Sequence, residues 1–421
     1  MTNAGGGDLR QSPVLRAASE AICALAFGHA LSDELVAAMR RPEWSRSLRM
    51  ACGIHGLGAL LGLRVLVGER LPLPDADQAW LAEQPGRNMA RHQRLAADLD
   101  AVVSALVDAG AQPVALKGAA MLLRDAPAEL AWRPMSDLDL LVSVRGRRDT
   151  VRQSGIAVRE LDLALAHAGY CVQRESWKHR AYGACAPGPP LVTDGGEHPD
   201  NPRDVEIHRR VVEQFRGYRW DITPVVCAAG VVHGDVRVPS DGAMALHLAA
   251  HASVTLLEGM HRAIHLIDLA RALERSGLAP VQAALQVAGA RQGGRFVYPA
   301  LALTARETGS SVAAALAEEL VADSRVPSGM VSWCAAVSLF DASWAGQGQR
   351  GVLGSQQVWA RDASERLRMT ASTLVPTPAV LSSDAYGGDG PLAWPGWYAR
   401  HYLRLARRVT PRLRRRGVMR S

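Results

Sequence analysis

The chain has 421 residues, 48% hydrophobic and 21% charged, which provides for a folded core and excludes wholesale disorder. Its formal net charge of +7 favours anionic partners such as nucleotides or RNA. No apolar stretch reaches the roughly 20 residues of a membrane span, and no signal peptide is evident at the amino terminus. The six cysteines are scattered without a CxxC motif, so we expect reduced thiols and a cytoplasmic protein.

The first part of the chain, 1–108, is expected to form an N-terminal helical region. Ser32 is placed to cap a short helix. Further along, apolar residues recur at intervals of three and four, as on one helix face: Leu95, Leu99, Val102 and Leu106. We expect this last helix to end near Gly110.

A mixed α/β segment is expected over 109–239. Its predicted strands are 112–116, 137–144, 170–175, 203–211 and 231–239. Helices are predicted after a Lys117-Gly118 turn and over 157–170, and a loop over 185–202.

Helices return at Ser240, a predicted cap, and continue through a C-terminal helical region, 240–373. An irregular segment and basic tail follow over 374–421. The fold class is therefore α+β, a small mixed β-sheet core flanked by N- and C-terminal helical regions.

Two carboxylates open the predicted strand at 137–144. Side chains two residues apart share a strand face, so Asp137 and Asp139 lie on one side. A divalent cation such as Mg²⁺ between them would relieve their repulsion, since Mg²⁺ is usually held by one or two carboxylates plus phosphates. A solvated strand end is the alternative.

Three further pieces of the same segment carry candidate chemistry. Lys117-Gly118 joins a strand to a helix, where a lysine, a glycine and free helix N–H groups suit phosphate. Arg133 precedes the aspartate pair and is placed to reach phosphate or to support the carboxylates. The strand at 203–211 puts Asp204, Glu206 and His208 on one face, which offers a third carboxylate. Taken singly, these pieces also fit an ordinary turn, a surface arginine and a polar edge strand.

The order of these pieces resembles the uncharacterised nucleotidyltransferase family of the DNA polymerase β-like superfamily. The matching stretches are Leu116-Lys117-Gly118, Arg133 to Val142, and Val205 to His208, with similar helical segments following, over about 90–421. The turn departs from the wider superfamily, which usually has Gly-Ser where this chain has Lys-Gly.

The resemblance implies a nucleotidyltransferase core with Mg²⁺ (or Mn²⁺) held by Asp137, Asp139 and Glu206. It implies NTP phosphates near Lys117 and Gly118. Strand phase also leaves Asp204 as a competing third ligand, and only the family pattern favours Glu206.

Other polar residues are weaker candidates. Lys178, His179, His208 and His251 are candidate substrate contacts, and His251 and Asp268 match polar positions of the family's helical segment. Two pairs have the HxxxH spacing of zinc ligands, but helix packing or substrate contact is the preferred interpretation: His247 with His251, and His261 with His265. The arginine-rich tail fits a solvated helix slightly better than an RNA or membrane contact.

We therefore expect an enzyme that transfers a nucleoside monophosphate from an NTP to a hydroxyl-bearing small molecule, peptide or protein. RNA, in particular tRNA, is the alternative acceptor, and we do not favour it. A non-catalytic nucleotide-binding module is the alternative of a different class. The nucleobase, the acceptor and the oligomeric state are not predicted by these motifs.

Overall fold

The structure is a computed structural model. It describes residues 12–145, 156–176, 178–186, 188, 191, 198–215, 218–228, 230–346, 358–375 and 395–403. The amino-terminal part is helical, as expected: α1 (Pro13–Phe27), α2 (Asp33–Met39), the 3₁₀ turn η2 (Pro42–Trp44), α3 (Ser45–His55), α4 (Gly58–Leu66) and α5 (Asp75–Asp108). Ser32 caps α2, since its hydroxyl accepts a hydrogen bond from the Leu35 N–H.

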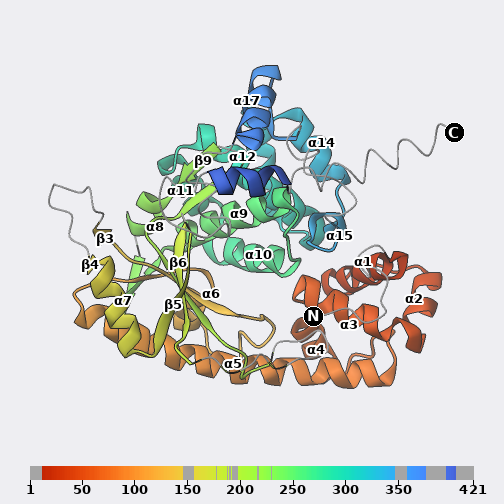
Figure 1. The fold of residues 1–421 in the computed structure, drawn as a ribbon. Coiled ribbons are helices and arrows are strands. Elements are labelled where there is room, and N and C mark those ends of the chain that lie inside the picture. Colours follow the sequence, from red (N-terminus) through yellow and green to blue (C-terminus); the bar gives the residue numbers. More distant parts are fainter. Residues whose placement is uncertain are drawn as a thin grey trace.

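Helix α5 connects the N-terminal helices with the sheet. It has 34 residues and runs along one edge of the molecule, from α1–α4 to the strands (Figure 1). The predicted apolar face is buried, as Leu95, Leu99, Val102 and Leu106 are at most 1% exposed. At the other end α4 packs tightly on α5, where a Cβ on Gly62 would lie 2.1 Å from the Leu81 carbonyl oxygen.

The core is a seven-stranded mixed sheet in the order β10-β11-β1-β2-β7-β6-β5. Its strands are β1 (Val114–Ala115), β2 (Asp137–Leu141), β5 (Tyr170–Glu175), β6 (His179–Ala184), β7 (Asp204–His208), β10 (Gly230–His233) and β11 (Val236–Pro239). Two small sheets pair β3 (Val144–Arg145) with β4 (Ile156–Ala157), and β8 (Val212–Phe215) with β9 (Tyr218–Asp221). The short helices of this segment are α6 (Lys117–Arg124), α7 (Val158–His167) and α8 (Thr223–Ala228).

Strand β6 and the β8–β9 hairpin were not predicted. The HRAYGA sequence of β6 contains glycine and two alanines, which have little strand propensity. It is extended because it pairs antiparallel with both β5 and β7. Pairing partners distant in sequence, and not local propensity, therefore decide this strand.

The expectation of six reduced thiols is wrong for two cysteines. Cys171 on β5 and Cys185 just after β6 form a disulfide, with Cα atoms 4.8 Å apart. The antiparallel β5–β6 pair brings them within bonding range, although they are 14 residues apart in sequence. Cys23, Cys52 and Cys334 are free and buried, while Cys227 is free and half-buried.

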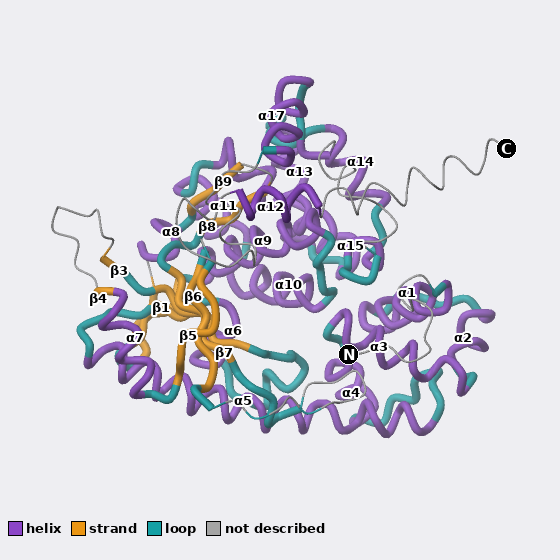
Figure 2. Tube along the Cα trace, in the orientation of Figure 1, coloured by secondary structure: helices purple, strands orange, loops and turns teal. Residues whose placement is uncertain are grey.

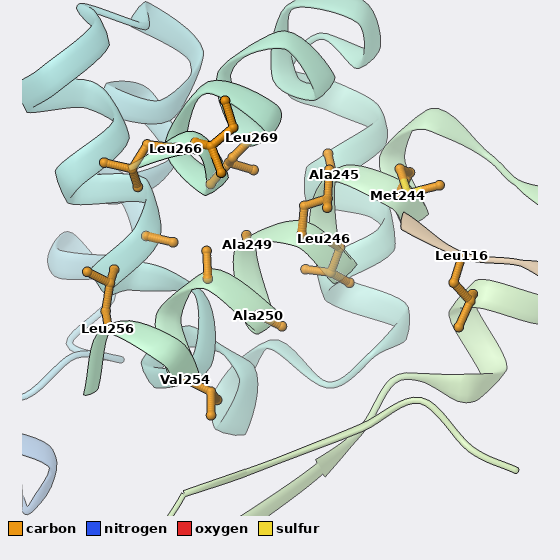
Figure 3. Packing of buried hydrophobic residues seen from close by; sticks show 14 of the residues in the cluster. Leu116, Met244, Ala245, Leu246, Ala249, Ala250, Val254, Leu256, Leu266 and Leu269 are labelled. Atoms are coloured by element: carbon orange, nitrogen blue, oxygen red, sulfur yellow. The ribbon is translucent and has the colours of Figure 1, made fainter. Parts of the chain in front are cut away.

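After β11 the chain continues as a series of helices (Figure 2). They are α9 (Asp241–Glu258), α10 (Ile264–Ser276), α11 (Leu278–Val287), α12 (Ala290–Thr308), α13 (Ser311–Ala322), α14 (Ser328–Ala336), α15 (Leu339–Ala342) and α17 (Ala363–Leu374). Helix α9 is central: Ser240 caps it, it contacts α10, α11 and α12, and Leu246, Ala249 and Ala250 are among its buried residues (Figure 3).

Two further sequence expectations concern this region. His265 is helical, but His261 precedes α10, so this HxxxH pair does not share one helix. Of the irregular segment and basic tail, 376–394 and 404–421 lie outside the described residues, while 395–403 is helical with Trp397 buried. No single helix in the described ranges has the length and apolarity to cross a membrane; the bent pair Pro42–His55 and Gly58–Leu66 has them only in combination.

Candidate functional site

The carboxylates singled out from the sequence meet on two neighbouring strands. β2 and β7 are parallel, and their register pairs Asp137 with Asp204 and Asp139 with Glu206. Because alternate side chains share a face, all four carboxylates lie on the same side of the sheet.

Asp139 is the most enclosed of these groups, at 3% exposure. Its Oδ1 accepts a hydrogen bond from the Lys117 ammonium at 2.9 Å and lies 2.8 Å from His208 Nε2. Burial alone would raise the pKa of Asp139, but Lys117 and His208 hold it well below its usual value. Asp139 is therefore charged at neutral pH.

Asp137 occupies the start of β2 and accepts a hydrogen bond from the Ser136 hydroxyl at 3.2 Å. Burial and the negative charge of Asp139 raise its pKa to about 6. The repulsion anticipated from the sequence is thus present, and Lys117 offsets it only in part.

Glu206 faces two imidazoles. Its Oε1 is 3.2 Å from His179 Nε2 and its Oε2 is 3.8 Å from His208 Nε2. In the described part of the chain, His179, Glu206 and His208 form a group whose candidate metal-ligand atoms all lie within 4.8 Å of one another. The sequence did not anticipate this grouping, because β6, the strand that carries His179, was not predicted.

Asp204, the rival third carboxylate, lies in a different environment. It is exposed at the first position of β7, whereas Glu206 is half-buried and ion-paired. Burial and repulsion from Glu206 raise the pKa of Asp204. Asp204 is therefore more open to solvent than Glu206, the other candidate for the third carboxylate.

The backbone conformation of the Lys117-Gly118 turn was not predicted from the sequence. Helix α6 begins at Lys117 itself, whose φ of 43° is unusual for a residue with a side chain. A Cβ on Gly118 would lie 2.9 Å from Met135 Sδ and 3.1 Å from an Arg133 guanidinium nitrogen. Gly118 therefore lets the start of α6 approach the segment that leads into β2.

The Lys117 ammonium lies among carboxylates. Burial lowers its pKa, but Asp139 and Asp137 more than compensate, so the pKa is raised overall and the ammonium stays charged. Arg133 is bound elsewhere: its Nε donates to both Asp268 oxygens, at 2.8 and 3.0 Å. Arg133 thus ties the core to α10, and Asp268, at 2% exposure, is its buried partner.

A cavity of about 170 Å³ opens beside these groups. One wall includes Lys117, Gly118, Asp137 and Asp139, and the other includes residues of α9, of α10 and of the segment between these two helices. His251, His265 and Asp268 belong to that second wall. The cavity therefore lies between the carboxylate-bearing sheet and the C-terminal helices.

Lys178 and His251 join a second buried cluster, around Glu213 on β8. The Lys178 ammonium donates to both Glu213 oxygens, at 2.9 and 3.0 Å, and His251 Nδ1 is 3.7 Å from Oε1. Burial would raise the pKa of Glu213, but Lys178 and His251 lower it well below its usual value. Glu213 was missed because its hairpin was not predicted.

Arg91 is a second residue that sequence reasoning missed. It is 1% exposed on α5, and its guanidinium donates to the carbonyls that precede β2 and β7: those of Met135, Ser136, His198, Asn201 and Pro202. It therefore fixes the two strand starts that carry the carboxylates. Its position within an ordinary helical pattern gave no signal.

The comparisons with known proteins agree with the geometry. The model of the family described as "Uncharacterised nucleotidyltransferase" matches residues 41–308, which include every candidate site residue. The match begins earlier than the resemblance read from the sequence and does not extend to the tail. No curated protein and no solved structure matched the chain. The chain belongs to the uncharacterised nucleotidyltransferase family.

Proposed function

We propose that this protein transfers a nucleoside monophosphate from an NTP to a hydroxyl-bearing acceptor and releases pyrophosphate, with a divalent cation at Asp137, Asp139 and Glu206. The observation that carries the proposal is the charge of the site. Three neighbouring carboxylates face one enclosed ammonium, that of Lys117. The other cations nearby are Arg174, whose side chain is 62% exposed, and Arg133, which is paired with Asp268. A divalent cation supplies the charge that this arrangement lacks.

The roles of the chain's own groups follow from their positions. The carboxylates of Asp137, Asp139 and Glu206 are oxygen donors of the kind that Mg²⁺ and Mn²⁺ accept. A bound cation would shield the α-phosphate and lower the pKa of the acceptor hydroxyl. Lys117 neutralises part of the charge that builds up in transfer, from a helix start that also offers free N–H groups.

The phosphates of the NTP are assigned to the cavity. Lys117, Gly118 and Arg133 line it beside Asp137 and Asp139. Its volume, about 170 Å³, is below the roughly 300–1,000 Å³ of typical ligand pockets, so we expect the phosphate chain inside and the nucleoside at the opening.

The acceptor is proposed as a small molecule, a peptide or a protein side chain. RNA is the second candidate, because the sequence from Trp397 to the end has nine arginines and no acidic residue. Transfer to RNA should weaken steeply with salt as phosphate contacts release counterions, and deletion of 398–421 should weaken RNA binding. Salt-insensitive transfer would favour the small-molecule or protein acceptor.

The proposal is tested by thermal unfolding with each of the four NTPs, with and without Mg²⁺. A nucleotide at 100 times its Kd should stabilise the protein by about 2.7 kcal/mol, and only with the cation present. The same experiment separates a catalytic protein from a nucleotide-binding module when pyrophosphate release is measured in parallel. Absence of any nucleotide-dependent shift would contradict both.

Substitution of Asp139 gives the sharper test. Asp139→Asn retains the shape of the side chain but removes the charge that Lys117 and His208 contact. We expect cation-dependent stabilisation by NTP and pyrophosphate release to be lost, with circular dichroism unchanged. Asp75→Asn, at an exposed surface ion pair, is the control and should leave both unaffected. Full activity of Asp139→Asn would refute the assignment.

A further inference from the structure

Two imidazoles and a carboxylate are held together by strand register, independently of any rotamer. His179 on β6 is the register partner of His208 on β7, and Glu206 lies two residues before His208. Paired residues of adjacent strands share a face, as do alternate residues of one strand. The backbone therefore gathers His179, Glu206 and His208 on one side of the sheet.

The same ring nitrogen of each histidine faces the carboxylate. Nε2 of His179 is 3.2 Å from Glu206 Oε1, and Nε2 of His208 is 3.8 Å from Oε2. The Nδ1 atoms of both rings are buried without a hydrogen-bond partner among the described residues. The polar contacts of these rings are thus made through Nε2, which for His208 is also 2.8 Å from Asp139 Oδ1.

These separations suit one shared ion. Two ligand atoms each about 2.1 Å from an ion lie at most about 4.2 Å apart. Both nitrogen–oxygen distances, 3.2 and 3.8 Å, are within that limit. The whole group spans up to 4.8 Å, so its farthest pair must close by up to about 0.6 Å. A small side-chain adjustment would bring all three donors to an ion, and each Nε2 would release to solvent the proton that it now shares with a carboxylate.

The neighbours of the group leave it open to a cation. The residue opposite Glu206 on β6 is Ala181, whose side chain ends at Cβ. The nearest mobile cation is Arg174, whose guanidinium is 3.7 Å from Glu206 Oε1 and 3.5 Å from His179 Nε2, and whose side chain is 62% exposed. Arg174 can turn outward to solvent when an ion binds.

We propose that His179, Glu206 and His208 bind Zn²⁺, or a divalent first-row transition ion that likewise favours imidazole, in preference to Mg²⁺. Imidazole suits zinc and other transition ions, whereas Mg²⁺ prefers oxygen ligands and gives up its water reluctantly. The inference deepens the proposed function by naming the cation at its third carboxylate. It rests on that function only for the part the ion plays in transfer, since metal binding itself needs no nucleotide.

The experiment measures the affinity of the full chain for ZnCl₂, MnCl₂ and MgCl₂ separately, by calorimetry, without nucleotide. The wild type should bind Zn²⁺ at least tenfold more tightly than Mg²⁺. His179→Gln should lower Zn²⁺ affinity at least tenfold and change Mg²⁺ affinity less than threefold. His167→Gln, an exposed histidine at the end of α7, is the matched control and should leave both affinities unchanged.

A second variant distinguishes a ligand from a structural support. His179→Asp replaces a nitrogen donor with oxygen donors and should shift selectivity from Zn²⁺ toward Mg²⁺ and Mn²⁺. Equal loss of Zn²⁺ and Mg²⁺ affinity in both His179 variants would overturn the inference, because it would mean that the ring only orients Glu206. Unaltered Zn²⁺ affinity in both would also overturn it.

Failure of this inference and failure of the proposed function give different results. Zn²⁺ binding that depends on His179, without any NTP-induced stabilisation, would retain the metal site and refute the transferase. NTP-induced stabilisation with Mg²⁺, together with Zn²⁺ affinity independent of His179, would refute the metal site alone.

Discussion

The side chains of the candidate site are constrained one by one by their immediate neighbours. Lys117 and His208 keep Asp139 charged. Met135 and Arg133 lie so close to Gly118 that a side chain there would collide with them. Single substitutions should therefore have local and separable effects, which two predictions exploit.

Gly118→Ala tests the close approach of α6 to the segment before β2. The added Cβ would lie 2.9 Å from Met135 Sδ, so Met135 and Arg133 must shift. We expect a loss of about 1–3 kcal/mol of stability and weaker nucleotide binding. Gly86→Ala is the matched control: it is helical, with nothing within 4 Å of its Cβ, and should stabilise by about 0.5–1 kcal/mol in denaturant unfolding. Equal stability changes would argue against a steric role for Gly118.

Lys178→Met tests the buried ion pair with Glu213. The carboxylate is 2% exposed and would lose its main cationic partner. We expect a loss of about 3–5 kcal/mol, measured by urea unfolding, because an uncompensated buried charge is costly. The double variant Lys178→Met/Glu213→Leu removes that charge and should recover part of the loss. A double variant no more stable than the single one would show that the ion pair is not the cause.

At the scale of elements, the site depends on where strands begin. β2 and β7 are parallel neighbours far apart in sequence, and their first residues carry the carboxylates. Arg91 on α5 binds the carbonyls just before both strands, so one side chain sets their relative position. The element that aligns the site is thus a helix outside the sheet.

Arg91→Met should therefore disturb the site without touching it. The substitution leaves several carbonyls near 135–136 and 198–202 without their donor, which costs about 1–3 kcal/mol for each one that water cannot reach. We expect lower stability and faster amide hydrogen exchange at the starts of β2 and β7. Arg87→Met, one turn earlier in an exposed pair with Glu83, should change neither. Unchanged exchange in Arg91→Met would contradict the positioning role.

Across the whole molecule, the N-terminal helices meet the C-terminal helices near His55. This residue ends α3, is fully buried, and neither ring nitrogen has a hydrogen-bond partner among the described residues. Burial, followed by the positive charge of Arg262 ahead of α10, lowers the pKa of His55 to about 3. Acid should therefore weaken the contact between the two helical regions.

The sign of this effect follows from proton linkage. The unfolded histidine has a pKa of 6.5 and takes up a proton that the folded one resists, so its contribution to stability is present above pH 6.5 and is lost as pH falls toward 3. The full loss is about 5 kcal/mol. His55→Leu should flatten this part of the pH–stability curve, and the exposed His167→Leu should not. Parallel curves for wild type and His55→Leu would refute the prediction.

The sequence by itself determined the features that depend on local order. Helical periodicity identified the N-terminal helices and α9, and strand alternation placed Asp137 with Asp139 and Glu206 with His208. The order of the Lys-Gly turn, the aspartate pair and the VEIH strand was sufficient to predict the family. These features were predictable because adjacent residues determine side-chain direction within one element.

Only the tertiary structure decided the features that need partners distant in sequence. β6 is a strand because β5 and β7 flank it, and this pairing brings His179 to Glu206 and Cys171 to Cys185. The same holds for Arg91 at the two strand starts and for Glu213 beneath Lys178. Long-range hydrogen bonding and burial override local propensity at these places, so the immediate environment of the carboxylates could not be read from the chain alone.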